Sequence, residues 1–490
     1  MRGMRVILAA GMLVFATSAS GQTTLYVDGS IGNDEVSRSA NTATTPWRTI
    51  GRAAWGSSDR SKPDSSEAAR AGDTVLVAAG TYSGSAPGRA RNIPLYNPVN
   101  SGTAGKPVTF RAQGRVTLQS PMYAGPVIGS YQRSYIVWDG FYLDEANVNT
   151  TPDTGPVVVW ASNFVTIQNL EISGTFAPYV DNHNGIRLEA ANNSLIKSNL
   201  IFGFGVMRNG RQERPRNSAA IMLYDSNNNT IENNELHSCG VGVFVKGVNQ
   251  GLGQDGTIIR YNDISNMGIS AVGMGLVLQT SSNAKVYQNV FHDISGGVEI
   301  EALAGPKGHP VNDIVANNTF HNIAVSAIWL RGNEALWENV RLYNNVVKNA
   351  KSMIRGEGVS IPGSLAFEHN VYSGVGGFAS LMNGEHDFDG WKNSFGKDKI
   401  SPPSTTSDPK FVNPSTRDFR LCTGPGQPAA SCSGTSPVLG LGIDILDLNG
   451  NGSTTDVIRP GAYVTGTEVV GRTNAANPVR RPPSAPGISR

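Results

Sequence analysis

One short phrase recurs nine times between residues 135 and 370, and every copy carries an asparagine or aspartate near its centre. Copies such as VTIQNLEI, TIENNEL, KVYQNVF and RLYNNVV surround this polar residue with apolar and β-branched ones. The shared position falls at Asp139, Asn169, Asn199, Asn234, Asn262, Asn289, Asn318, Asn345 and Asn370. A unit of this length buries its apolar face only against neighbouring units, so the repeat predicts a coiled solenoid of short strands.

The asparagine has a mechanical role in such a stack. We predict that it sits at a sharp corner between two strands, because asparagine tolerates a left-handed backbone. Its amide can then bond the equivalent amide one coil above and one coil below, as in other asparagine ladders.

The N-terminal sequence and the charge balance suggest where the protein works. Residues 1–21 begin MRGMRVILAAGMLVFATSAS, with two arginines, an apolar run and small residues, which predicts a secretory signal peptide. Removing Arg2 and Arg5 leaves 38 basic and 38 acidic residues, so the protein has no net positive charge that would attract nucleic acid. No later segment has the length of a membrane span. We expect a secreted or periplasmic monomer.

Three cysteines remain in the chain. Cys422 and Cys432 lie ten residues apart in a glycine- and proline-rich stretch, so a local disulfide is plausible in an oxidising compartment. Cys239 follows a ladder repeat and is expected to pack as a small apolar residue.

The chain divides by its patterns into four further parts. Residues 22–105 should form an N-terminal cap and the first coils, with short helices in PWRTIGRAAW and SSEAARAG. Residues 106–395 hold the β-helix repeats, and residues 396–472 form an irregular closing segment. The proline-rich tail, residues 473–490, is expected to be disordered.

Several motifs of the chain resemble those of a known protein family. The family is the secreted right-handed parallel β-helix proteins of the pectate-lyase-like group, and the motifs are YVDGSIGND, PWRTI, GDTVLVAAGTY and the NxxIxxNxI ladder. SDPKFVNPSTRDFRL and IRPGAYVTG resemble the closing segment of that group. The resemblance implies an all-β, single-stranded right-handed parallel β-helix of about 9–11 coils. It specifies activity poorly, because this scaffold carries lyases, hydrolases, epimerases and noncatalytic adhesive proteins.

A second series of strands precedes the ladder residues, including NGIRLEA, AAIMLYD, VGVFVKG and GGVEIEA. Their period of two predicts which side chains point inward and which point outward. The outward side chains form two columns along the solenoid. The first column is Val158, Arg187, Met222, Phe244, Val277, Glu299 and Trp329. The second column is Trp160, Glu189, Tyr224, Lys246, Gln279, Glu301 and Arg331. Arg355 and Glu357 are provisional continuations.

These columns predict a groove for a glycan, although an ordinary solvated sheet face would also be polar. The substrate-binding candidates are Arg187, Tyr224, Phe244, Gln279, Trp329 and Trp160. Four arginines in one insertion would suit an acidic polysaccharide, although such a run is more often a solvated loop. Two residues of a later loop are further binding candidates, because a loop on a rigid stack is a usual place for them. These loop residues are Arg208, Arg211, Arg214, Arg216, Lys307 and His309.

The leading hypothesis is β-elimination in a uronate-containing polysaccharide. A cation must neutralise the uronate carboxylate before a base can take the weakly acidic C5 proton. The resemblance implies that the base is a lysine or arginine on this strand and that calcium commonly bridges substrate to protein. Lys246 is the candidate base, and Arg331 is its acid-side partner or, with Arg187, a neutralising cation. The candidate calcium ligands are Glu189, Glu299 and Glu301.

Other interpretations use the same residues. Lys246 could be a surface ion-pair partner, and Glu301 could form a salt bridge with Arg331 instead of binding metal. Glu299 and Glu301 could act as the acid and base of a glycoside hydrolase, although they would point from one wall. C5 epimerisation would begin with the same proton abstraction, and a noncatalytic glycan-binding protein would need no base.

Overall fold

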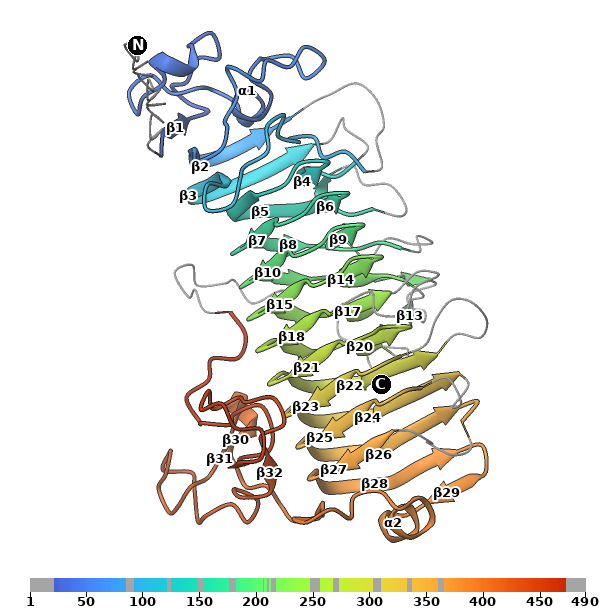
Figure 1. The fold of residues 1–490 in the computed structure, drawn as a ribbon. Helices are drawn as coiled ribbons and strands as arrows, with labels where there is room; N and C mark the ends of the chain where they lie inside the picture. The colour runs from blue at the N-terminus through green and yellow to red at the C-terminus, as the bar shows by residue number, and fades with distance from the viewer. Residues whose placement is uncertain are drawn as a thin grey trace, which may run out of the picture.

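The computed structural model of this chain describes residues 22–84, 92–120, 125–148, 154–175, 182–205, 207–208, 211–212, 217–246, 256–267, 273–302, 310–332, 337–359 and 365–472. Over these residues the chain winds into an elongated parallel β-helix (Figure 1). The predicted all-β fold is therefore confirmed, with N-terminal and C-terminal segments outside the coil. The predicted signal peptide and tail lie outside the described residues.

Three stacks of short parallel strands form the walls of the coil, and we name them faces 1, 2 and 3 (Figure 1). Face 1 consists of β7 (Thr166–Gln168), β10 (Leu195–Lys197), β15 (Thr230–Glu232), β18 (Ile258–Arg260), β21 (Lys285–Tyr287), β23 (Ile314–Ala316), β25 (Arg341–Tyr343) and β27 (Ala366–Glu368). Face 2 begins with β8 (Glu171–Ser173), β11 (Leu200–Phe202), β16 (Glu235–His237) and β19 (Asp263–Ser265). Face 3 begins with β4 (Ile128–Tyr131), β6 (Val157–Trp160), β9 (Ile186–Glu189), β14 (Ala219–Tyr224), β17 (Val241–Lys246) and β20 (Met274–Gln279).

Later coils use long strands that continue from face 2 into face 3. These strands are β22 (Val290–Ala302), β24 (Thr319–Gly332) and β26 (Val346–Glu357). β22 pairs with β19 on face 2 and with β20 on face 3, and β24 and β26 stack on it in turn. The last coil ends with β28 (Val371–Leu381) and its antiparallel partner β29 (Gly384–His386). The first strands are β1 (Thr24–Val27), β2 (Thr74–Ser83), β3 (Val108–Ser120) and β5 (Ile136–Val148).

The interior holds the apolar residues that period-two alternation places inside. Each of them is at most 2% exposed, which confirms the predicted orientation. They are Ile186, Leu188, Ile221, Leu223, Val243, Val245, Leu276, Leu278, Val298, Ile300, Ile328 and Leu330. Because such burial contributes about 25 cal/mol per Å² of apolar surface, the stacked interior is the main source of stability.

A buried asparagine ladder runs along the coil between faces 1 and 2. Its members are Asn199, Asn234, Asn262, Asn289, Asn318, Asn345 and Asn370. From Asn234 onward, each Oδ1 accepts two hydrogen bonds from the asparagine one coil before it. Asn262 Oδ1, for example, accepts from both N and Nδ2 of Asn234 at 3.0 Å. The predicted amide ladder is confirmed for these coils.

The corner differs from the prediction in one respect. The left-handed residue is the one before each ladder asparagine, as at Asn233, Tyr261 and Gln288, where φ is 54°, 57° and 54°. A left-handed residue there turns the chain and aims the next side chain inward, so the asparagine serves the ladder and its neighbour serves the corner.

The ladder also begins two coils later than predicted, at Asn199. Asn169 is itself left-handed, with φ of 57°, and its Nδ2 donates to Asp139 Oδ1 at 2.6 Å. Leu170 occupies the ladder position of that coil, since its N donates to Asn199 Oδ1 at 2.9 Å. The assignment of Asp139 and Asn169 to the ladder is therefore wrong, because the phrase is offset by two residues at Asp139 and by one residue at Asn169.

Both ends of the coil are covered. Helix α1 (Ile50–Trp55) lies beside β1 and β2, and its first turn is capped by Thr49, whose Oγ1 accepts from Arg52 N at 3.1 Å. The second predicted helix, in SSEAARAG, is wrong, because Asp64 Oδ1 accepts from Ser66 N at 2.9 Å and forms a turn.

Helix α2 (Phe388–Phe395) covers the opposite end of the coil, at the bottom of Figure 1. Asp387 caps its first turn, with Oδ1 accepting from Gly390 N at 2.6 Å. Trp391 is fully buried and packs edge-on against Phe367 of the last coil. A covered end removes an exposed strand edge that would otherwise pair with other chains.

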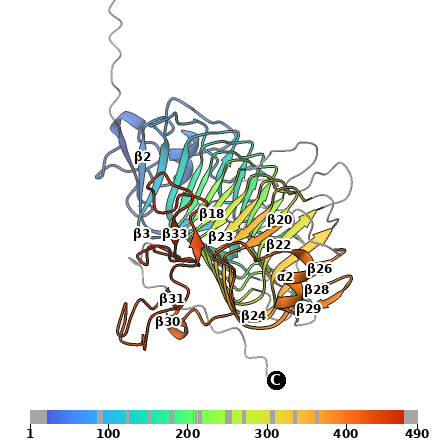
Figure 2. The same cartoon turned by 60° about the horizontal axis from the view of Figure 1, so that its bottom comes forward.

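The closing segment, residues 396–472, packs over the outer side of face 2 (Figures 1 and 2). It contains β30 (Phe411–Asn413), β31 (Asp418–Leu421), β32 (Gly442–Ile443) and β33 (Val457–Ile458). Three corner asparagines donate their Nδ2 to its carbonyl groups: Asn344 to Ile443 at 2.7 Å, Asn317 to Arg459 at 3.2 Å and Asn233 to Val469 at 2.7 Å. The segment therefore runs back along the coil, antiparallel to the direction of stacking.

Cysteine pairing agrees with the sequence. Cys422 and Cys432 form a disulfide within the closing segment, with Cα atoms 5.5 Å apart. Cys239 is buried in the coil, and this burial raises the pKa of its thiol to about 12, as suits a packing residue. No helix in the described part of the chain is long and apolar enough to cross a membrane.

Candidate functional site

Face 3 carries both predicted columns, and strand pairing confirms their register. The first column passes through Val158, Arg187, Met222, Phe244, Val277, Glu299, Trp329 and Arg355. The second column passes through Trp160, Glu189, Tyr224, Lys246, Gln279, Glu301, Arg331 and Glu357. Each residue is one rung, or about 4.8 Å, from the next. Arg355 and Glu357, provisional from the sequence, thus continue the columns.

The first column is buried from Val158 to Trp329, which corrects part of the sequence analysis. Phe244 and Trp329 are only 4% and 2% exposed, so their predicted role as open aromatic platforms is wrong. They belong with Met222, Val277 and neighbouring side chains to an apolar cluster outside the coil. The guanidinium of Arg355 also lies 4.4 Å from the centre of the Trp329 ring. Apolar side chains stacked at rung spacing touch one another and exclude water from their faces.

A pocket of about 220 Å³ opens on face 3 where β9, β14 and β17 lie side by side. Its walls are Asn182, Arg187, Glu189, Asn217, Met222, Tyr224 and Lys246. The pocket thus brings together the candidate base Lys246, the binding candidates Arg187 and Tyr224, and the candidate metal ligand Glu189. Trp160 lies one rung before Glu189, and Gln279 lies one rung after Lys246.

Two cations lie on either side of the Tyr224 ring. Arg187 Cζ, one rung before it, and Lys246 Nζ, one rung after it, are each 5.7 Å from the ring centre. Lys246 Nζ also donates to Asn217 Oδ1 at 3.3 Å. The pocket therefore has two cationic walls around one phenol ring, and cations interact favourably with such a ring.

Arg187 is held in place by Glu189 on the same strand. Glu189 Oε2 accepts from Arg187 Nε at 2.8 Å and lies 2.7 Å from the second nitrogen, NH2. The Arg187 side chain is only 6% exposed, so it forms part of the pocket floor instead of projecting freely. Such a charge-assisted pair fixes the orientation of the guanidinium group, and the Glu189 carboxylate offsets part of its positive charge.

Hydrogen bonds of the neighbouring residue His183 hold the wall of the pocket near Asn182. His183 is buried, pairs through Nε2 with Glu145, and donates its backbone N to Ser218 Oγ at 3.3 Å. These bonds join the loop of Asn182 to the loop of Asn217. The sequence suggests a turn-capping role near Asn182, and it gives no periodic signal for Asn217, which follows the arginine-rich insertion.

The structure does not bring Arg331 to Lys246. Three rungs separate them, a distance of about 14 Å along the column. Arg331 instead pairs with Glu299 at 3.0 Å, Glu301 at 3.5 Å and Glu357 at 3.1 Å. Burial alone would lower the pKa of Arg331, but the hydrogen bond to Glu299 and the neighbouring carboxylates raise it. The salt-bridge interpretation of Glu301 is confirmed.

The candidate calcium ligands are separated in the same way. Glu189 pairs with Arg187, whereas Glu299 and Glu301 lie around Arg331. In the described parts of the chain no three acidic, histidine or cysteine side chains gather as metal ligands would. Carboxylates already paired with arginine do not fit a calcium site as they stand, because calcium needs several free oxygen ligands.

The two flanking loops are described in part. Arg208 and Arg211 lie in a two-stranded hairpin, β12 (Met207–Arg208) and β13 (Arg211–Gln212), whose backbone alone is described. The other residues of these loops that the sequence singled out lie outside the described residues: Arg214, Arg216, Lys307 and His309.

A second cluster of titratable groups lies on face 2, beneath the closing segment. His292 is buried between Asp263 and Asp293, with Nε2 2.9 Å from Asp263 Oδ1 and Nδ1 2.7 Å from Asp293 Oδ2. Burial alone would lower the pKa of His292, but these two hydrogen bonds raise it to about 9. Arg417 of the closing segment lies 3.8 Å from Asp263 and 3.7 Å from Glu235. This cluster ties the closing segment to the coil.

Comparison with known proteins supports the same architecture. A family model described as a right handed beta helix region matches residues 155–311 and, in an overlapping match, residues 216–388. A search of curated proteins finds no significant match to the sequence.

Among solved structures, the chain is similar to pectate lyase Pel9A, with a TM-score of 0.51 and 13% identity over 91% of this chain and 97% of that chain. It is also similar to the catalytic unit of a GH87 α-1,3-glucanase from Streptomyces thermodiastaticus, with a TM-score of 0.45 and 13% identity over 74% of this chain and 67% of that chain. An alginate lyase from Paenibacillus has a TM-score of 0.37 and 16% identity over 63% of this chain and 91% of that chain. At these identities the likeness concerns the fold.

Proposed function

Because the chain is a right-handed parallel β-helix protein with a pectate-lyase-like fold, we propose that it cleaves an acidic polysaccharide by β-elimination in the face 3 pocket. The observation that carries the proposal is the pair of cations, Arg187 and Lys246, on either side of Tyr224 in a polar pocket. The pectate lyase with the same fold acts on a polyuronate by its name, which makes a carboxylated sugar the natural first substrate class.

The pocket has the groups that an elimination needs. A uronate carboxylate beside Arg187 would have its charge offset, which makes the neighbouring C5 proton easier to remove. Lys246 in its uncharged form would take that proton. The C5–H electron pair then forms the C4=C5 double bond, the C4–O bond breaks, and the departing oxygen takes a proton from the new ammonium or from water. Tyr224 would hold the sugar between the two cations.

Hydrolysis is the weaker alternative on the geometry of face 3. Glu299 and Glu301 both contact the same nitrogen of Arg331, so the two carboxylates lie beside one cation on a single wall. A glycoside hydrolase instead needs one of its two carboxyl groups to carry a proton and needs the pair to flank the bond. Epimerisation at C5 and binding without turnover stay open, because the former uses the same proton abstraction and the latter needs no base.

The deciding experiment is a substrate screen of the purified protein. Pectate, alginate and glycosaminoglycans are each incubated with added calcium or with a chelator, and ultraviolet absorbance reports the unsaturated product. We expect absorbance to rise with at least one polyuronate. Lys246→Ala should lower the rate by at least about 100-fold, since a general base contributes about that much or more. The control variant is Lys285→Ala, at an exposed position of β21 on face 1.

Each competing function gives a different result in this screen. New reducing ends without ultraviolet absorbance would indicate hydrolysis, and altered C5 configuration without cleavage would indicate epimerisation. Glycan binding that survives Lys246→Ala, with no product from any polymer, would contradict the lyase proposal and favour a binding protein. Calcium is treated as a variable, because the carboxylates of face 3 are already paired with arginines.

We also propose that the protein works outside the cytoplasm. Residues 1–21 read as a secretory signal, and the Cys422–Cys432 disulfide suits an oxidising compartment. N-terminal sequencing of the exported protein tests this, and a mature chain that still begins at Met1 in the cytoplasm would contradict it.

A further inference from the structure

The second column of face 3 carries different kinds of side chain before and after the pocket. Before the pocket it carries two aromatic residues, Tyr131 and Trp160, on adjacent rungs. After the pocket it carries Gln279 and then the charged rungs that include Glu301 and Glu357. The pocket therefore has an aromatic approach on one side and, on the other, a charged approach in which Glu301 and Glu357 flank Arg331.

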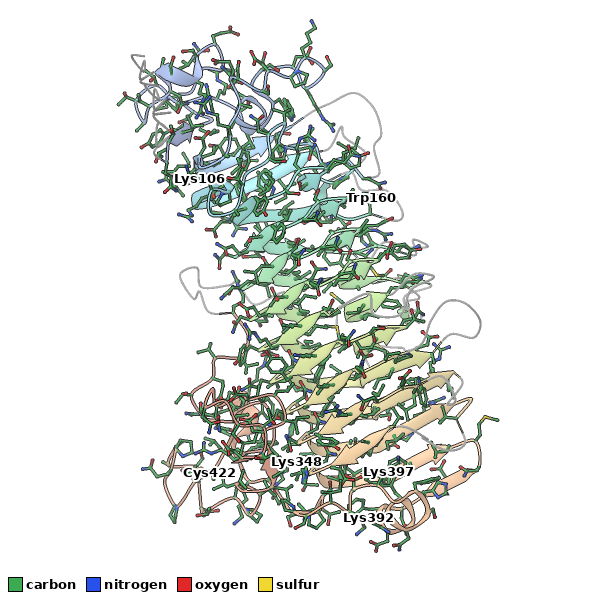
Figure 3. All side chains as sticks on the ribbon, in the orientation of Figure 1. Lys106, Trp160, Lys348, Lys392, Lys397 and Cys422 are labelled. Carbon is green, nitrogen blue, oxygen red and sulfur yellow. A yellow bond between two sulfur atoms is a disulfide. The ribbon has the colours of Figure 1, made fainter. Side chains whose placement is uncertain are left out.

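The aromatic side is suited to stacking on sugars. Tyr131 and Trp160 are both partly exposed, unlike the buried aromatic residues of the first column. Figure 3 shows Trp160 near the first coils, on the opposite side of the molecule from the closing segment that carries Cys422. At rung spacing, Trp160 is about 14 Å and Tyr131 about 19 Å from Lys246 along the column. A partly exposed ring offers an apolar face to a pyranose, whose own C–H face is apolar.

These two rings stand on a fixed backbone. Tyr131 N donates to Asn97 Oδ1 at 2.7 Å, and Asn97 Nδ2 returns a bond to Tyr131 O at 3.3 Å. Trp160 O accepts from Gln132 N at 3.1 Å and from Ser162 Oγ at 2.8 Å. A platform held in this way costs little ordering entropy when a ligand binds.

The opposite side carries a small excess of negative charge. Within the described part of these rungs, the carboxylates of Glu299, Glu301 and Glu357 surround the guanidinium groups of Arg331 and Arg355. Three negative charges against two positive charges leave one negative charge in excess. Around the pocket, by contrast, Arg187 and Lys246 outnumber Glu189. The sign of the local charge therefore reverses near Gln279, so a uronate beyond this rung would meet like charge.

We infer that the substrate chain lies on only one side of Lys246, stacked on Trp160 and Tyr131, with a chain end near Gln279. This inference rests on the proposed function. In that arrangement the C4–O bond beside Lys246 is close to the end of the polymer, and each elimination releases a short unsaturated or saturated fragment toward Gln279. The protein is thus an exo-acting lyase whose affinity for long chains comes from the aromatic rungs.

Product size over time tests the inference. On a polyuronate that the wild type cleaves, we expect mono- or disaccharide-sized products from the first minutes, with little early loss of viscosity. Trp160→Ala should raise KM for long chains about tenfold while leaving kcat near the wild-type value, since removing one stacking contact of this kind is worth about that factor. Trp160→Phe should restore most of the affinity.

The controls separate folding, stacking and chemistry. Phe164→Ala removes a 44% exposed ring at another place on the surface and should leave KM unchanged. Glu357→Gln should allow longer products, because it removes the excess negative charge. Circular dichroism and melting curves verify that each variant is folded. Rapid viscosity loss with a ladder of intermediate products, or an unchanged KM in Trp160→Ala, would overturn this inference alone. Absence of any unsaturated product would overturn the proposed function itself, and this inference with it.

Discussion

His292 offers the sharpest test of how the closing segment is held to the coil. The perturbation is His292→Gln, which keeps a polar side chain on face 2 but removes the charge that Asp263 and Asp293 share. Arg417 and Glu235 face the same cluster, so the test concerns the contact between coil and closing segment.

The magnitude follows from the pKa. The pKa of His292 rises from 6.5 to about 9 on folding, and one pKa unit corresponds to 1.36 kcal/mol, so the charged form stabilises the fold by about 3 kcal/mol. Because the folded pKa is the higher one, this stabilisation is complete below pH 6.5 and disappears as the pH rises through 9. The side chain is 1% exposed, so solvent screens the interaction little.

The assay is denaturant unfolding of both proteins at several pH values between 5 and 9.5. We expect the wild type to be more stable than the variant at low pH by about 3 kcal/mol, and this difference should shrink to near zero by pH 9.5. Groups that titrate elsewhere in the protein affect both chains equally and cancel. Two stability curves that stay parallel across this range would refute the reasoning, since His292 would then contribute no pH-dependent stability.

The remaining predictions concern the ladder, the end cap and the disulfide. Asn262→Ala should lower the free energy of unfolding by about 3 kcal/mol or more, because it leaves several buried partners unbonded at about 1–3 kcal/mol each. The control variant Asn312→Gly, at an exposed left-handed corner, should change the free energy of unfolding by less than about 1 kcal/mol. Denaturant unfolding midpoints compare the two variants. Trp391→Ala should destabilise by about 3–5 kcal/mol and promote concentration-dependent association, measured by light scattering. Reducing Cys422–Cys432 should cost about 2–3 kcal/mol, with faster hydrogen exchange confined to the closing segment; uniform exchange changes would contradict this.

The fold was largely predictable because every coil repeats the same alternation of inward and outward side chains. Period-two alternation orients each short strand, and neighbouring coils must align their apolar residues, so the register of Arg187, Tyr224 and Lys246 followed from spacing alone. The left-handed corner was misplaced by one residue because an asparagine serves equally well as a ladder residue or a corner residue. Helix α2 was missed because it is only eight residues long and contains the poor helix formers Gly390, Asn393 and Ser394.

The site was only partly predictable for a different reason. Alternation identifies a side chain as outward-facing, but it does not say whether other side chains cover it. Phe244 and Trp329 point outward and are still buried, since their neighbours on the same face are apolar too. The partners of Arg331 also needed coordinates, because three carboxylates compete for one guanidinium across adjacent rungs. Ion-pair choice at this range depends on side-chain geometry that spacing does not fix.

The closing segment makes the coil a structure of fixed length. Its bonds to Asn344, Asn317 and Asn233 are spread over several rungs of one corner, and one continuous stretch of chain spans them. A duplicated or deleted coil between these points would shift one anchor past another by about 4.8 Å, which no single bond can absorb. Evolution of this protein by adding repeats would therefore require a matching insertion in the closing segment, which is distant in the sequence.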